Sequence, residues 1–231
     1  MHIGMIGGIG PAATVTYYQK LVAAFRDLGE PLELTIVNAH VNTLVGNAEA
    51  GRNHEQARVF AGLLARLKGA GADFGTITSL GGHFCFAETL AISPLPMVSA
   101  IAPMDDYFAK AGIRTIGLLG ARQVTGSNLF GLLGQTLAIS PDDMDAVHSA
   151  YLETALSASC SADQRALFFA QGQEMINRGA DAVLLGGSDL GLAFDGYDPG
   201  FPVVDGVDVH VSALVDLATG KRALDGMPVS K

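Results

Sequence analysis

Residues 3–8 read IGMIGG, and residues 116–121 read IGLLGA. Each stretch is a short apolar run that ends in glycine or a small residue, which is typical of a buried strand followed by a tight turn. A second pair of motifs, GAD at residues 71–73 and GAD at residues 179–181, opens another apolar run in each half. Six residues after each aspartate the chain reaches Ser79 in the first copy and Gly187 in the second. We therefore predict a duplicated half, with paired loops that meet at one site.

Apolar runs and amphipathic stretches alternate along the whole chain. Strands are predicted near residues 2–6, 33–38, 74–78, 97–101, 115–119 and 182–185, and helices at 11–28, 55–68, 84–91, 105–111 and 162–178, from Ser127, and after Asp208. Strands that alternate with helices form parallel sheets with helices on their faces. The predicted fold class is therefore α/β, with two pseudo-symmetric three-layer lobes built on mainly parallel sheets.

The lobe boundaries follow from the point where the pattern restarts. Residues 1–102 together with 208–231 are expected to form the N-terminal lobe, and residues 103–207 the C-terminal lobe. Ligands of parallel sheets bind beyond the carboxyl ends of the strands. We expect the active site in the crevice between the lobes, with Ser79 and Gly187 facing each other across it.

The composition excludes several classes of function. The net charge of -9, from 14 Lys and Arg against 23 Asp and Glu, argues against a nucleic-acid surface. No apolar stretch reaches the roughly 20 residues that cross a bilayer, so no membrane partner is expected. Two distant cysteines do not make a disulfide scaffold, and we expect a reduced, cytoplasmic setting. The six histidines lie at no metal-ligand spacing, and residues 7–10 lack a complete dinucleotide fingerprint, so neither a metal nor a cofactor is predicted.

Residues 7–18, GGIGPAATVTYY, resemble the opening signature of the aspartate/glutamate racemase superfamily. Further matches in the family's order are residues 69–74, 118–120 with Thr125, 179–186, and 202–205 followed by His210. The resemblance covers nearly the whole chain. It implies two α/β lobes, a homodimer, no cofactor, and a small carboxylate or amino acid as substrate.

Members of this superfamily racemise with two opposed cysteines, in loops that resemble Cys-Asn-Thr-x-His and Gly-Cys-Thr-Glu. Here the two loops read SLGGH at residues 79–83 and GGSD at residues 186–189, so Ser79 and Gly187 stand at the cysteine positions. A serine hydroxyl is far more basic than a thiol and needs another group to take its proton, and glycine offers no proton. The two-cysteine mechanism is therefore impossible on these residues. The changed loops also predict a larger and less polar pocket.

Four polar side chains remain as catalytic candidates: Ser79, His83, Asp189 and His210. His83 lies four residues after Ser79 and could serve as its base; the alternative is that Ser79 caps the following helix and His83 is a buried structural residue. Asp189 could equally cap a helix, and His210 could equally make a structural hydrogen bond. Cys85 is expected to be an inert packing residue, with a displaced catalytic thiol as the alternative.

The loops also contain a set of substrate-binding candidates. Backbone N–H groups of paired glycines suit a carboxylate or an oxyanion, although tight turns explain such glycines equally well. Thr125 and Ser188 could donate hydroxyl hydrogen bonds, and Arg52 could pair with a carboxylate or simply lie on the surface. The full predicted set is Gly8, Ile9, Asn42, Arg52, Gly81, Gly82, Thr125, Gly187 and Ser188.

Three functions fit these observations. The first is an isomerase of the racemase family that acts at the α-carbon of a small carboxylate or amino acid by a changed mechanism. The second is a lyase or decarboxylase of the same superfamily, and the third is a catalytically dead homologue that binds carboxylates. If the chain is an enzyme, the motifs predict that it depends on His83 and Ser79 and tolerates thiol alkylation.

Overall fold

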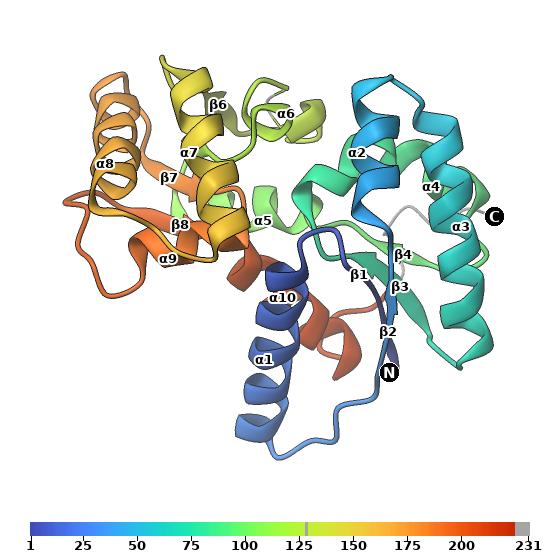
Figure 1. Cartoon of the computed structure of the whole chain (residues 1–231). Helices are drawn as coiled ribbons and strands as arrows, with labels where there is room; N and C mark the ends of the chain where they lie inside the picture. Colours follow the sequence, from blue (N-terminus) through green and yellow to red (C-terminus); the bar gives the residue numbers. More distant parts are fainter. Residues whose placement is uncertain (128, 225–231) are drawn as a thin grey trace. The chain divides into compact units, whose positions relative to one another are not determined.

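The computed structural model describes residues 1–127 and 129–224, and it contains two parallel four-stranded sheets (Figure 1). The first sheet has the order β2-β1-β3-β4, with β1 (Ile3–Gly7), β2 (Leu34–Asn38), β3 (Phe74–Ile77) and β4 (Met97–Val98). The second sheet has the order β6-β5-β7-β8, with β5 (Thr115–Leu119), β6 (Leu137–Ile139), β7 (Ala182–Leu185) and β8 (Val203–Asp205). The predicted α/β class with two sheet-based halves is confirmed.

Ten α-helices are found in the part of the chain that the structure describes. They are α1 (Pro11–Leu28), α2 (Val41–Glu49), α3 (Asn53–Gly69), α4 (Phe86–Ile92), α5 (Ala102–Ala111), α6 (Arg122–Thr125), α7 (Met144–Ser157), α8 (Ala162–Asn177), α9 (Gly191–Phe194) and α10 (Gly206–Ala218). Three short 3₁₀ helices, η1 (Leu80–Cys85), η2 (Leu129–Gly131) and η3 (Ser188–Leu190), follow β3, α6 and β7.

The chain divides into two compact units. The first unit contains Met1–Ala100 and the residues from Val211 onward, and the second contains Ile101–His210. In the first unit α3 covers the sheet with Phe60, Leu64 and Leu67, which belong to its hydrophobic core. In the second unit α8 covers the sheet with Phe168 and Met175.

The duplication extends to the register of the strands. Ile3 of β1 is aligned with Phe74 of β3, and Ile116 of β5 is aligned with Ala182 of β7. The spacing that follows these pairs is the same in both copies. Ser79 therefore lies two residues beyond the end of β3, and Gly187 lies two residues beyond the end of β7. Both residues have extended backbones and both precede a 3₁₀ helix. The sequence motifs therefore mark equivalent positions in the two units.

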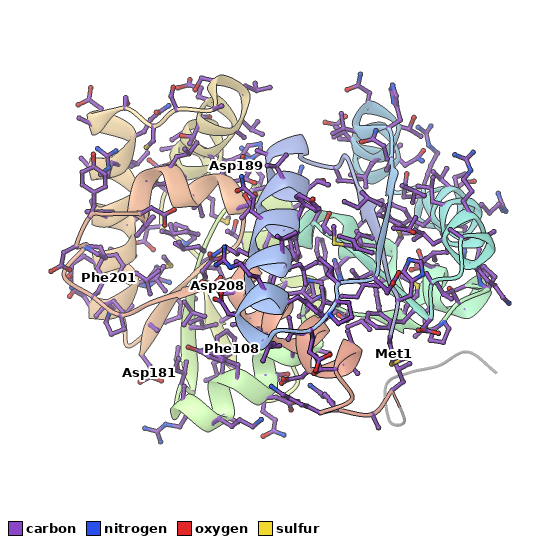
Figure 2. All side chains as sticks on the ribbon, turned by 90° about the horizontal axis from the view of Figure 1, so that it is seen from below. Met1, Phe108, Asp181, Asp189, Phe201 and Asp208 are labelled. Carbon is purple, nitrogen blue, oxygen red and sulfur yellow. The ribbon has the colours of Figure 1, made fainter. Side chains whose placement is uncertain are left out.

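The repeated Gly-Ala-Asp motifs secure the amino-terminal edge of each sheet. Asp73 accepts a hydrogen bond from the backbone N–H of His2 at 2.7 Å. Asp181 accepts two, from Arg114 N at 2.8 Å and Thr115 N at 2.9 Å, and these donors lower the pKa of its carboxyl group. Figure 2 shows Asp181 far from Asp189, which follows the other end of β7. The motif is structural and lies away from the carboxyl-terminal loops.

One element of the prediction is wrong. The helix expected from Ser127 is not formed by the described residues: α6 ends at Thr125, and the chain then passes through η2 into β6. Leu129 and Phe130 have φ angles of 54° and 59°, which a right-handed helix does not allow. Six further elements, α2, α6, α7, α9, β6 and β8, were not predicted from the sequence. None of the helices in residues 1–127 and 129–224 combines the length and the apolar character needed to cross a bilayer.

Candidate functional site

In the first unit, the loops after β1 and β3 come together at the carboxyl edge of the sheet. Gly8 has a φ of 82°, its N–H donates to Thr14 Oγ1 at 2.9 Å, and a Cβ on it would lie 2.6 Å from Asn38 Cγ. The Cδ1 atom of Ile9 lies 3.6 Å from the place where Gly82 would carry a Cβ. The structure therefore places predicted residues of both loops beside one another.

The hydroxyl of Ser79 is not tied to the helix that follows it. Ser79 is the residue before η1 and makes no side-chain capping hydrogen bond. Its Oγ lies 3.6 Å from the position where Gly81 would carry a Cβ, so it points over the loop. The capping alternative is absent from this structure, and Ser79 remains a predicted site residue.

The imidazole of His83 is fully engaged by the backbone. Its Nδ1 lies 2.8 Å from the carbonyl oxygen of Ser79, and its Nε2 accepts a hydrogen bond from Ala100 N at 2.9 Å. A carbonyl oxygen can only accept, so the neutral tautomer carries its proton on Nδ1. The ring stacks on Phe86 at a centroid distance of 5.1 Å. Burial lowers the pKa of His83 to about 4, which keeps the ring neutral.

This arrangement leaves His83 without a free nitrogen for the hydroxyl of Ser79. The Nδ1 proton goes to the Ser79 carbonyl, four residues earlier, and the Nε2 lone pair is occupied by Ala100. The geometry favours the structural alternative, in which His83 fixes the loop that presents Ser79. His83 still shapes the site, because it sets the position of the loop's backbone.

Cys85 is buried within the first unit. Its Sγ lies 3.7 Å from Thr89 Oγ1, and burial, the largest effect, raises the pKa of the thiol to about 11. A thiolate is the nucleophilic and basic form, so a thiol with a raised pKa is a poor catalyst. This environment favours the packing role over a displaced catalytic thiol.

Arg52 and Asn42 lie on different parts of the first unit. The guanidinium of Arg52 donates through Nε to Asn47 Oδ1 at 3.0 Å and through Nη2 to Gly46 O at 3.1 Å, so it closes the end of α2. Asn42 is exposed in the first turn of α2. The roles of Asn42 and Arg52 in substrate recognition stay predictions. Two nitrogen atoms of the Arg52 guanidinium already donate hydrogen bonds within the protein.

In the second unit, Gly187, Ser188 and Asp189 follow β7 at the carboxyl edge. The hydroxyl of Ser188 is buried and has no hydrogen-bond partner among the residues that the structure describes. The N–H of Gly186 donates to Leu119 O at 2.7 Å, and the N–H of Gly82 in the first unit donates to Ser79 O at 3.1 Å. These two glycine N–H groups are therefore not free to bind a carboxylate.

Tyr151 of α7, which the sequence analysis did not single out, fills the space above Gly187. A Cβ on Gly187 would lie 2.7 Å from Cε2 and 2.8 Å from Cζ of the Tyr151 ring, and nearest to its hydroxyl oxygen. The larger, less polar pocket stays a prediction, but this loop does not leave the space above Gly187 open. The phenol occupies the room that a side chain at position 187 would need.

The hydroxyl of Tyr151 donates to Asp189 Oδ2 at 3.3 Å. Burial is the largest cause that raises the pKa of the phenol, and the charge of Asp189 raises it further. Burial likewise raises the pKa of Asp189, which is 8% exposed. No local spacing signals this pair, because Tyr151 lies on α7, in a part of the chain where no helix was predicted.

The remaining predicted residues of the second unit are buried. Thr125 is 1% exposed, and its hydroxyl points to the carbonyl oxygens of Ala121 and Arg122, both at 3.4 Å. His210 is fully buried in α10. Within residues 1–127 and 129–224, no group of three or more His, Cys, Asp or Glu side chains is placed to hold a metal ion.

Known structures show the same arrangement of elements. A candidate Asp/Glu racemase from Yersinia pestis is 22% identical, covers 95% of this chain and 100% of its own, and superposes with a TM-score of 0.81. An aspartate racemase homologue from Pyrococcus horikoshii OT3 is 24% identical over 94% of this chain and 99% of its own, with a TM-score of 0.79. Arylmalonate decarboxylase is 18% identical over 96% and 94%, with a TM-score of 0.51.

At these identities the structural likeness establishes the fold. The family is established by the sequence itself, because residues 6–214 match the family model described as Asp/Glu/hydantoin racemase. That match contains both duplicated halves and both loops at which Ser79 and Gly187 stand. The chain belongs to the Asp/Glu/hydantoin racemase family.

Proposed function

We propose that this protein is an enzyme that acts at the α-carbon of a small carboxylate or amino acid without using a thiol. Its membership of the racemase family supports the substrate class. The environment of Cys85 supports the absence of thiol chemistry, because burial disfavours its thiolate. The leading reaction is isomerisation at the α-carbon.

The observation that carries the proposal is the buried, unpartnered hydroxyl of Ser188. An unsatisfied hydroxyl costs about 1–3 kcal/mol when it is shielded from water, so such groups are retained where a ligand satisfies them. Ser188 directly follows Gly187, at the carboxyl edge where ligands of parallel sheets bind. A substrate carboxylate would supply the acceptor that the Ser188 hydroxyl lacks within the protein.

Decarboxylation is the second candidate, and the geometry of His83 favours it. Racemisation needs a base that removes the α-proton, but both ring nitrogens of His83 are bonded to the backbone. Decarboxylation needs no such base, because the departing CO₂ leaves its electron pair on the α-carbon. Arylmalonate decarboxylase, which shares the fold, catalyses a reaction of this type.

The test uses the full-length protein with a panel of amino acids, dicarboxylates and 2-substituted malonates in D₂O. Proton NMR reports exchange of the α-hydrogen, and release of CO₂ reports decarboxylation. Exchange without CO₂ supports the isomerase, and CO₂ release supports the lyase. Ligand-induced thermal shifts without either reaction would show a binding protein and refute the proposal of an enzyme.

Ser188→Ala tests the observation directly. Removal of an unsatisfied buried hydroxyl leaves the free protein as stable as before or more stable, by up to about 1 kcal/mol. The same change weakens substrate binding, seen as a higher KM or a smaller thermal shift. The matched control is Ser159→Ala, which removes a hydroxyl from the exposed turn after α7. Equal effects of the two substitutions on binding would argue against a carboxylate at Ser188.

A further inference from the structure

We propose that Tyr151 is a catalytic residue: its hydroxyl stands in for the side chain that Gly187 lacks and delivers a proton to the α-carbon of the substrate. The inference rests on the proposed function in its decarboxylation form, since a single donor on one face of the α-carbon suits that reaction and not racemisation. It also explains how a glycine can stand at this loop position without leaving the second unit devoid of a transferable proton.

The Tyr151 ring and a side chain at position 187 compete for the same space. Gly187 lies at the start of the loop after β7, and the Tyr151 ring comes within 2.8 Å of the position of its absent Cβ. Contacts this short essentially never occur, so a larger residue at 187 would require the Tyr151 side chain to move. The phenol oxygen of Tyr151 therefore lies in the space that a side chain at 187 would need.

The phenol of Tyr151 is held in place by its helix and by Asp189. Asp143 caps α7 by accepting a hydrogen bond from Ala146 N at 3.0 Å, so the helix begins at a defined residue. The ring of Tyr151 packs on the hydrophobic core of the second unit, and its hydroxyl is directed by Asp189. Asp189 is thus a positioning residue, because its carboxylate fixes the direction of the Tyr151 hydroxyl.

The Tyr151 hydroxyl can transfer its proton to a carbanion at the α-carbon. Burial and the neighbouring carboxylate raise the pKa of Tyr151, so the phenol keeps its proton at neutral pH. A carbanion next to a carboxylate is far more basic than a phenolate and takes that proton. The hydroxyl first turns from Asp189 Oδ2 towards the α-carbon, and the electron pair of the carbanion then forms the new C–H bond as the O–H bond of Tyr151 breaks. The phenolate then takes a proton from water, which restores the protonated phenol for the next turnover.

Proton delivery by a single residue determines the stereochemistry of the product. Racemisation requires proton transfer on both faces of the α-carbon, whereas a single rigid donor serves one face only. A prochiral substrate that loses CO₂ would therefore give a product of one hand. In D₂O the new C–D bond would form on the same face in every turnover. A residue with a merely structural role would not control this property.

Tyr151→Phe is the decisive variant, because it removes the hydroxyl and keeps the ring that fills the space above Gly187. We expect turnover to fall by about 100-fold or more, as is typical when a general acid is removed. Substrate-induced thermal shift should stay close to that of the wild type, and the residual product should lose its single hand. Tyr107→Phe, an exposed phenol on α5, is the matched control and should change none of these.

A rescue experiment separates proton donation from packing. The double variant Tyr151→Ala with Gly187→Cys removes the ring and puts a thiol in the vacated space. We expect its turnover to be at least about tenfold higher than that of Tyr151→Ala alone. We also expect iodoacetamide to inhibit it, since the donor is then a thiol. Gly187→Cys alone should disrupt the loop, because Tyr151 still occupies the site.

The outcomes distinguish this inference from the proposed function. Full turnover and unchanged stereochemistry in Tyr151→Phe would overturn the role of Tyr151 and leave the α-carbon reaction standing. A wild-type protein that turns over none of the substrate classes would overturn the proposed function and the inference with it. Loss of turnover with a racemic residual product supports both.

Discussion

At the scale of single residues, His83 contributes to the loss of stability in acid. Its pKa of about 4 in the folded state lies below the ordinary value of 6.5, because burial disfavours the charged ring. The unfolded chain therefore binds a proton that the folded chain does not bind between these two values. The contribution of His83 to the free energy of unfolding is therefore complete above pH 6.5. About 3 kcal/mol of it is lost as the pH falls towards 4.

We predict that His83→Gln removes this pH dependence. The variant loses the hydrogen bonds to Ser79 and Ala100, so it is less stable at neutral pH, but its free energy of unfolding changes less between neutral pH and pH 4. Urea unfolding at a series of pH values measures both effects. His54→Gln, at an exposed position of α3, should keep the slope of the wild type. Parallel curves for all three proteins would show that His83 is not the source.

The same residue bears on activity. Because His83 holds the Ser79 carbonyl and Ala100 together, its loss is expected to displace the loop even if the ring transfers no proton. We therefore predict that His83→Asn abolishes turnover, in agreement with the sequence-based hypothesis but for a positional reason. A flat pH profile of kcat across pH 5–7 in the wild type would favour this reason over acid–base catalysis by His83.

The two cysteines should differ sharply in reactivity. Cys85 is fully buried with a raised pKa of about 11, whereas Cys160 is partly exposed beside α8. We predict that iodoacetamide modifies Cys160 first and leaves turnover intact, and that Cys85→Ala is nearly as active as the wild type. Mass spectrometry of the alkylated peptides with parallel assays checks this. Inactivation that follows the modification of Cys85 would mean that this thiol takes part in the reaction.

At the scale of elements, two glycines in helices are expected to respond in opposite ways to the same substitution. Gly62 lies in the middle of α3 with nothing within 4 Å of its Cβ position, so Gly62→Ala should stabilise the protein by up to about 1 kcal/mol. Gly172 lies in α8, where a Cβ would come within 2.9 Å of Phe201 Cε2. Gly172→Ala should therefore destabilise the protein, by about 1–3 kcal/mol. Denaturant unfolding of the pair gives the sign of each change.

The elements that the sequence predicted are those with the strongest local signals. β1 and β5 are wholly or largely buried runs closed by glycine, and the Gly-Ala-Asp motifs precede β3 and β7. β6 is an edge strand of three residues whose Leu137 is 69% exposed, so its pattern resembles that of a loop. α7 buries Val147, Ala150 and Thr154, and its other residues mix polar with apolar side chains. Such elements depend on tertiary packing, which a local pattern does not record.

The candidate site divides in the same way. Ser79, Gly187 and Ser188 were predicted from the sequence because they lie at fixed distances from repeated motifs. Tyr151 was missed because its relation to Gly187 exists only in space: the two positions belong to different elements, and no spacing rule joins them. The bonds of His83 to Ser79 and Ala100 were likewise invisible, since Ala100 contributes only its backbone.

At the scale of the whole molecule, charge and stability act together in acid. The chain has a net charge of -9 at neutral pH and an isoelectric point near 4.9, so mutual repulsion between molecules vanishes near pH 5. This pH falls inside the window, from 6.5 down to about 4, in which the contribution of His83 is lost. The wild type should therefore approach its least soluble pH while it is also becoming less stable.

We predict that the wild type aggregates more steeply than His83→Gln as the pH is lowered from 7 to 5, provided the two are compared at temperatures equally far below their melting points at pH 7. Both proteins lose the same repulsion, because His83 is neutral in the folded state, but only the wild type loses the free energy linked to its histidine. Light scattering during acid titration, with circular dichroism on the same samples, separates the two causes. If aggregation begins at the same pH in both proteins while both remain folded, charge alone controls solubility and the histidine has no part in it.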